Sequence, residues 1–170
     1  EIGDKRGVAT SLHNIGIIHR NRGDYGEALK CFEESLKIAR NIEKNFGIRI
    51  NLLSIGSLHQ CLYALEKAIE YHNDSLALTE TVGVMGEKID ALNAIGTDYH
   101  LMGDNEKALQ YLNDALKRVK DVGFNESEPD VLVSLCDVWL SKGDSEKTSK
   151  FCDRLLEVAE KNYLKEYLAR

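Results

Sequence analysis

Apolar and polar positions along the chain recur in one register, with a period of 40 residues. Each copy has a leucine, then three residues later a pair that is isoleucine–glycine in the first three copies and leucine–cysteine in the fourth, then a ring. These columns are Leu12, Leu52, Leu92 and Leu132; Ile15, Ile55, Ile95 and Leu135; Gly16, Gly56, Gly96 and Cys136; and His19, His59, Tyr99 and Trp139. Because the register needs no insertion or deletion, the pattern indicates four copies of one structural unit.

Within each copy the spacing is helical. Leu12, Ile15, Gly16 and His19 stand at i, i+3, i+4 and i+7, which places them on one face of a first helix. A second stripe begins at Ala28 and predicts a second helix. A single proline in the whole chain also favours helices, because proline breaks helix interiors. Each copy is therefore predicted to be a helical hairpin.

The turn between the two helices is marked in three of the four copies. The dipeptides Gly23-Asp24, Gly103-Asp104 and Gly143-Asp144 combine a residue that tolerates the left-handed conformation with a residue that caps helices. The second copy has Tyr63-Ala64 instead, so we expect either a strained turn or a shifted one. The glycine column that contains Gly16 predicts a close approach between the two helices.

These columns resemble the tetratricopeptide repeat, in which a leucine–glycine pair is followed by an A-x3-F element. Ile15-Gly16, Ala28 and Phe32 carry the likeness, and the 40-residue period resembles the longer variety of kinesin light chains, spindle-orientation adaptors and bacterial signalling proteins. The resemblance implies an all-α, right-handed superhelical α-solenoid of antiparallel helix pairs. We expect about four repeats in a single array over 1–170, near 7–46, 47–86, 87–126 and 127–166, within a longer protein. Before the fourth repeat, Ser127 and Pro129 indicate a cap and a first-turn proline.

In the family the first helices line a concave groove, and the phase of each helix predicts which side chains face it. The predicted groove residues are His13, Asn14, Ile17, Arg20, Leu53, Ser57, Gln60, Asp90, Asn93, Thr97, His100, Asp130, Val133 and Asp137. The first half of this set is basic and apolar and the second half is acidic. This gradient suggests a ligand with apolar anchors and a basic segment, and the alternative is that the aspartates only solvate an empty face. The lysine–asparagine clamp for C-terminal carboxylates is not matched.

The sequence lacks the usual patterns of catalytic and metal sites. It has no His-Glu-x-x-His, no Cys-x-x-Cys and no histidine pair at i, i+4, so we expect no catalytic residue, no metal and no cofactor. We interpret His19 and His59 as interior rings, and the four cysteines as reduced, mostly buried thiols. The net charge of −6, without a basic run, argues against nucleic acid and membrane partners.

The function predicted from these features is a cytoplasmic protein–protein interaction scaffold that binds a peptide or a partner protein in its groove. Two alternatives stay open: a peptide- or metabolite-sensing arm of a larger signalling protein, and a substrate-binding accessory of an enzyme. Self-association through exposed solenoid ends is a further open alternative.

Overall fold

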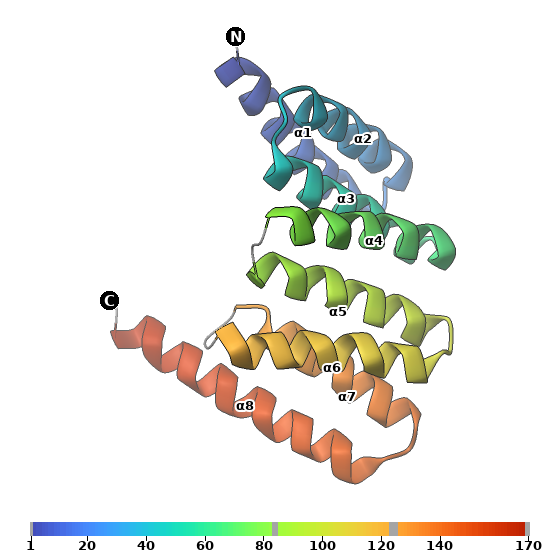
Figure 1. Cartoon of the computed structure of the whole chain (residues 1–170), viewed down its shortest axis with the longest axis vertical. Coiled ribbons are helices and arrows are strands. Elements are labelled where there is room, and N and C mark those ends of the chain that lie inside the picture. The colour runs from blue at the N-terminus through green and yellow to red at the C-terminus, as the bar shows by residue number, and fades with distance from the viewer. Residues whose placement is uncertain (1, 83–84, 123–125, 169–170) are drawn as a thin grey trace. The chain divides into compact units, whose positions relative to one another are not determined.

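The computed structural model describes residues 2–82, 85–122 and 126–168, and these residues form helices joined by short turns (Figure 1). The helices are α1 (Ile2–Arg22), α2 (Tyr25–Asn41), α3 (Asn45–Cys61), α4 (Leu65–Val82), α5 (Met85–Leu101), α6 (Asn105–Val122), α7 (Glu128–Ser141) and α8 (Ser145–Leu168). Sequential helices pack as the pairs α1/α2, α3/α4, α5/α6 and α7/α8. The predicted all-α fold of antiparallel helix pairs is confirmed.

The chain divides into two compact units, Glu1–Val84 and Met85–Arg170, each with two hairpins. In unit 1, α2 packs on α3, and α1 also contacts α3. In unit 2, α6 packs on α7, and α5 contacts α7. The first helices of neighbouring hairpins are therefore adjacent within each unit. The single array and its four repeat boundaries stay predictions, and α3 begins at Asn45, two residues before the predicted second repeat.

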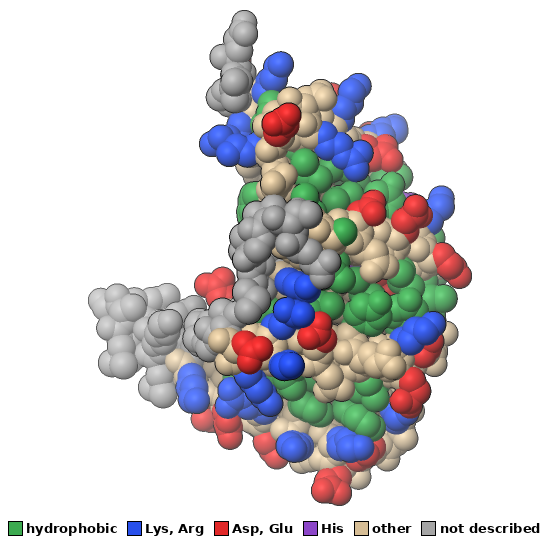
Figure 2. Space-filling model, viewed as in Figure 1, with side chains coloured by type: hydrophobic (Ala, Val, Ile, Leu, Met, Phe, Trp, Pro, Cys, Tyr) green, Lys and Arg blue, Asp and Glu red, His purple; other side chains and the backbone are tan. Residues whose placement is uncertain are grey.

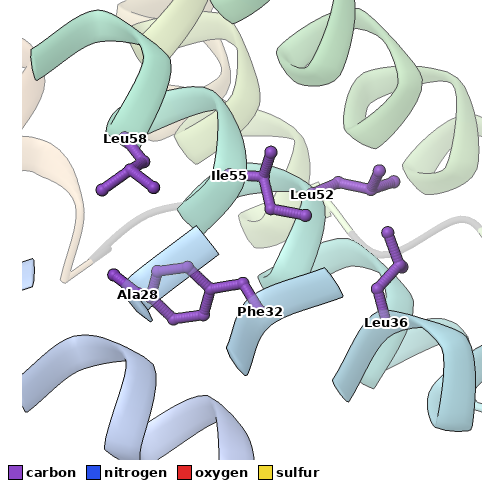
Figure 3. Close-up of a cluster of buried hydrophobic side chains, with 6 residues drawn as sticks. All are labelled: Ala28, Phe32, Leu36, Leu52, Ile55 and Leu58. Carbon is purple, nitrogen blue, oxygen red and sulfur yellow. The ribbon is translucent and has the colours of Figure 1, made fainter. Parts of the chain in front are cut away.

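The core of unit 1 lies between α2 and α3 (Figure 3). Ala28, Phe32 and Leu36 project from α2 toward Leu52, Ile55 and Leu58 of α3, and each of the six is at most 6% exposed. These residues come from the columns that recur along the sequence. The hydrophobic period therefore predicts not only the helices but the side chains that join one hairpin to the next.

The glycine column makes room for a side chain of the second helix in the same hairpin. A β-carbon added at Gly16 would lie 2.6 Å from the Phe32 ring, and one at Gly96 would lie 2.7 Å from Leu112. The close approach that we expected is therefore between the first helix and a large side chain. In the fourth hairpin the same two positions hold Cys136 and Cys152.

The turn of the second hairpin is strained and not shifted. Tyr63 has φ 54°, in the left-handed region that Gly23, Gly103 and Gly143 occupy in the other turns. Its amide donates to the carbonyl of Gln60 at 3.0 Å, which matches the bond from Gly23 to Arg20. Tyr63 therefore carries the free-energy cost that a residue with a β-carbon has in the left-handed region.

The predicted aspartate caps form in two of the three turns. Asp104 accepts a hydrogen bond from the Lys107 amide at 3.1 Å, and Asp144 accepts one from the Lys147 amide at 3.0 Å. Asp24 stands at the same position but makes no capping bond with its side chain. The predicted proline start of α7 is confirmed, with Ser127 at the N-cap.

Two expectations about burial are wrong. His19 and His59 are half-buried and not interior, because their column lies at the rim of each hairpin; the ring of His59 stacks on Tyr71 with centroids 5.5 Å apart. The cysteines are not mostly buried, since Cys61 and Cys152 are exposed while Cys31 and Cys136 are half-buried.

Candidate functional site

A buried polar network joins the first three helices of unit 1. The Ser35 hydroxyl donates to the carbonyl of Ala9 at 2.8 Å, and the Asn51 amide donates to Ser35 Oγ at 2.9 Å and to the Gly47 carbonyl at 2.8 Å. Asn51 Oδ1 lies 3.0 Å from Nδ1 of His13, which must be the donor because the amide oxygen only accepts. Ser35 and Asn51 are each 1% exposed, so the network fixes the α1–α3 spacing from inside.

A hollow of about 360 Å³ lies next to this network, between α1, the end of α2 and the start of α3. Its walls are partly apolar, from Ala39, Ile42 and Ile50, and Phe46 stands at its edge with 60% of its surface exposed. Thr10, His13, Asn14 and Asn51 add polar groups. The hollow therefore combines apolar walls with hydrogen-bonding groups.

The charged side chains that line the hollow are Arg6 and Lys44, both basic. Within the described residues neither of them has an ion-pair partner. The Arg49 guanidinium lies over the Phe46 ring, 5.3 Å from its centroid, and brings a third positive charge near the same edge. The charged side chains that line the hollow are thus of one sign, positive, although the chain as a whole carries a charge of −6.

Two of the groove residues predicted in unit 1 lie at the hollow. His13 and Asn14 line it, and His13 also packs on the Phe32 ring with centroids 5.3 Å apart. Ile17 packs instead against the buried core cluster. Arg20 on α1 and Leu53, Ser57 and Gln60 on α3 are half-buried and lie outside the hollow's lining.

In unit 2 several predicted groove residues contact the neighbouring first helix. The Ser127 hydroxyl at the N-cap of α7 hydrogen-bonds to Asp90 of α5. The Thr97 hydroxyl donates to the Asn93 carbonyl at 2.9 Å and lies 3.3 Å from the hydroxyl of Ser134 on α7. Asp90 and Thr97 therefore help to hold α5 against α7.

The other predicted residues of unit 2 differ in how available they are. His100 Nδ1 lies 2.7 Å from the side-chain oxygen of Asn105. The side-chain oxygen of Asn93 is buried and has no hydrogen-bond partner among the described residues. Asp130, Val133 and Asp137 are exposed on α7, which also exposes 67% of Leu140. Of the three predicted acidic groove residues, Asp130 and Asp137 are therefore exposed on α7, whereas Asp90 is hydrogen-bonded to Ser127.

Sequence reasoning missed the residues that the α2–α3 turn brings to the hollow. Lys44, Phe46 and Ile50 lie between the columns that define the repeat, and Arg6 lies before them. A usable signal was Phe46, an aromatic residue that lies outside the repeat columns and close in the sequence to two basic residues, Lys44 and Arg49. The periodic pattern gives no weight to such a residue.

Charges of both signs are interspersed over the face shown in Figure 2, with apolar patches exposed between them. Among the described residues no three His, Cys, Asp or Glu side chains are placed to hold a metal ion. None of the described helices combines the length and the apolar character needed to cross a bilayer.

One apolar face of α1 is uncovered. Ile15 and Ile18 are 43% and 50% exposed, whereas Ile55 and Leu58, 40 residues later, are fully buried against α2. Val8 continues this exposed face. Self-association through it stays a prediction.

Two models of the tetratricopeptide repeat match the sequence, over residues 7–81 and 89–118. No curated protein matches the chain.

Solved structures are similar in fold. BtubC (BKLC) from P. vanneervenii has 16% identity and a TM-score of 0.76 over 91% of the chain, and aspartyl phosphate phosphatase F from Bacillus subtilis has 14% identity and a TM-score of 0.83 over 96%. A protein of the kinesin light chain type from Podosopora anserina, with nearly identical TPR-like repeats, has 12% identity and a TM-score of 0.64 over 91%. The match with this chain covers 64%, 44% and 76% of these three proteins, which is less than two thirds of the first two.

Proposed function

Because the chain belongs to the tetratricopeptide repeat family, we propose that it is a protein-interaction scaffold that binds an extended segment of a partner protein. The observation that carries this proposal is the hollow of unit 1. It joins an exposed aromatic ring, Phe46, to two basic side chains, Arg6 and Lys44, that have no ion-pair partner within the described residues. Such a combination of an apolar anchor point and open charges is typical of a recognition surface.

The chemistry of the hollow selects for one kind of ligand residue. A carboxylate would form charge-assisted hydrogen bonds with Arg6 and Lys44, and the Asn14 amide would supply a further donor. A neighbouring large apolar side chain would cover Ile42, Ile50 and the ring of Phe46. We therefore propose that unit 1 binds a peptide segment with an acidic residue next to an apolar one.

The surface of α7 in unit 2 has the opposite charge. Asp130 and Asp137 are exposed on either side of Val133, which is itself 44% exposed. A basic segment with an apolar side chain would complement it. We propose that Asp130 and Asp137 bind such a segment.

The proposed role needs no catalytic residue, and the proposed partner is a protein and not nucleic acid or a membrane surface. The net charge of −6 and the mixed charges over the visible face (Figure 2) support a protein partner, because nucleic acid requires clustered cations. A cytoplasmic location remains part of this proposal.

A random peptide phage-display library is the direct probe. Selection on the whole chain is expected to enrich peptides in which Asp or Glu stands beside Phe, Leu or Ile. The double charge reversal Arg6→Glu/Lys44→Glu is expected to lower the affinity of the chain for the selected peptides by at least about tenfold. Each lost charge-assisted hydrogen bond is worth about 1.5–3 kcal/mol.

The matched control is Lys117→Glu/Lys120→Glu, which makes the same change of net charge on the exposed side of α6. This control is expected to keep peptide affinity within a factor of about two. Equal losses in both double variants would refute a specific role of the hollow. If selection yields no binding peptide, the scaffold proposal fails for this chain.

A further inference from the structure

Two cysteine thiols face each other within the last hairpin. Cys136 on α7 and Cys152 on α8 have their sulfur atoms 3.4 Å apart, and both are free thiols (Figure 1 shows the two helices). Cys136 is half-buried and also lies 3.9 Å from the carbonyl of Thr148, whereas Cys152 is exposed. One thiol is therefore open to solvent and the other stands directly behind it.

The repeat explains why these two positions meet. They correspond to the column pair of a glycine and a large side chain, and the equivalent β-carbon of Gly56 would lie 2.4 Å from the His72 ring. Two side chains of intermediate size take the place of a small one and a large one in the fourth hairpin. The packing of the two helices in the hairpin thus brings these two positions next to each other.

We propose that Cys136 and Cys152 form a reversible modification site, at which a peroxide oxidises the two thiols to a disulfide that links α7 to α8. The sulfur atoms would approach by about 1.4 Å to reach an S–S bond of about 2.05 Å. Rotation of two side chains and a small helix shift supply such a movement. The proposal concerns a site separate from the hollow of unit 1.

The exposed thiol of Cys152 and the half-buried thiol of Cys136 have different parts in the reaction. The Cys152 thiolate attacks one peroxide oxygen, the O–O bond breaks, and hydroxide leaves; Cys152 is now a sulfenic acid. Cys136 then loses its proton and attacks the Cys152 sulfur, the S–O bond breaks, and the oxygen leaves as water. The two thiols lose two electrons in total and hydrogen peroxide is reduced to two waters.

The surroundings of Cys136 agree with this order. Burial raises the pKa of Cys136 to about 12, and the hydrogen bond with Cys152 acts in the same direction. Cys136 is therefore almost entirely a neutral thiol at pH 7 and is a poor first nucleophile. It reacts second, when a sulfenic acid already stands beside it.

The test is peptide mapping of the whole purified chain after treatment with hydrogen peroxide and alkylation of the remaining thiols. Trypsin separates all four cysteines, because Cys136 falls on the peptide 121–142 and Cys152 on the peptide 151–154. The expected product is a linked pair of these two peptides, with a loss of about 2 Da in the intact chain that dithiothreitol reverses. The melting temperature of the oxidised chain is expected to rise by several degrees, because the link constrains the unfolded hairpin.

Two control variants keep the result interpretable. Cys152→Ser is expected to form no disulfide at Cys136, which stays fully open to alkylation, and to show no mass loss. Cys136→Gly/Cys152→Leu restores the residue pair of the third hairpin and is expected to fold, with a melting temperature that peroxide does not change. Cys61 is exposed and serves as an internal reference, since it should stay available to alkylation.

The proposal is overturned if peroxide produces only sulfinic or sulfonic acid at Cys152, if the disulfides join Cys61 of two chains, or if Cys136 and Cys152 both remain open to alkylation. It is also overturned if the melting temperature rises equally in the Cys136→Gly/Cys152→Leu chain.

Discussion

The turn of the second hairpin makes a measurable prediction about stability. Tyr63 occupies the left-handed region at φ 54°, where the equivalent residue of the other three turns is glycine. Its side chain is 78% exposed, so replacing it removes little buried surface. The substitution Tyr63→Gly therefore changes the backbone cost and leaves almost everything else as it is.

Two opposing effects set the magnitude. A residue with a β-carbon pays about 1–2 kcal/mol in the left-handed region, and Tyr63→Gly removes this cost. Glycine gives the unfolded chain more conformational freedom, which costs about 0.4–1 kcal/mol. The difference favours the variant by about 0.5–1 kcal/mol. For a unit of this size the melting temperature should rise by about 2–8 °C.

Thermal unfolding followed by circular dichroism, with a urea titration for the free energy, measures the effect. The matched control is Gly103→Tyr in the turn of the third hairpin, where φ is 85° and an added β-carbon meets no atom within 4 Å. The control introduces the same cost that the variant removes. Its expected change is therefore of the same size and of opposite sign.

A particular pair of results would contradict the strain argument. If Gly103→Tyr lowers stability while Tyr63→Gly fails to raise it, the Tyr63 side chain must contribute contacts that offset its backbone cost. If neither substitution changes the free energy of unfolding, the left-handed conformation carries no penalty in these turns.

Three further predictions concern packing, pH and the polar network. Gly56→Ala places a β-carbon 2.4 Å from a ring in α4 and should cost about 1–3 kcal/mol in urea unfolding, whereas Gly7→Ala, with open space around it, should gain about 0.5–1 kcal/mol. Burial lowers the pKa of His59 from its ordinary value of 6.5, so the folded state binds fewer protons than the unfolded chain. Stability should therefore fall as the pH drops below about 6.5, and His59→Tyr should flatten this part of the profile; identical profiles would contradict the assignment. Asn51→Ala removes the central amide of the buried network and should lower the free energy of unfolding, measured in urea, by about 2–3 kcal/mol. The exposed control Asn14→Ala should lower it by less than about 0.5 kcal/mol.

Much of the fold follows from the sequence because one signal is repeated four times. A residue such as Ile55 is apolar in every copy, and its burial against α2 follows from the helical period. The turn at Tyr63 was predictable as an exception for the same reason, since three other copies define the rule. Whether the turn is strained or shifted depends on how the surrounding helices pack, so only the structure could decide between the two.

The candidate site was less accessible because it is built from residues that do not repeat. Asn51 is followed in its column by Ala91 and Val131, so the pattern indicates burial but gives no reason to expect a hydrogen-bonded amide. Its partner Ser35 lies 16 residues earlier on another helix. Periodicity identifies faces, whereas a polar network depends on which individual atoms meet across them.

The Ser35–Asn51 link has a consequence for how such a chain can be rebuilt or diversified. Hairpins with a common period resemble interchangeable modules, and gene duplication would shuffle them freely if every joint were apolar. A copy that carries Ala91 or Val131 at this place offers no amide to Ser35, whose hydroxyl would retain only the bond to Ala9. Replacing the second hairpin by such a copy would therefore cost the free energy of the buried hydrogen bonds that Asn51 makes, so the first two hairpins are better matched to each other than a common period alone would make them.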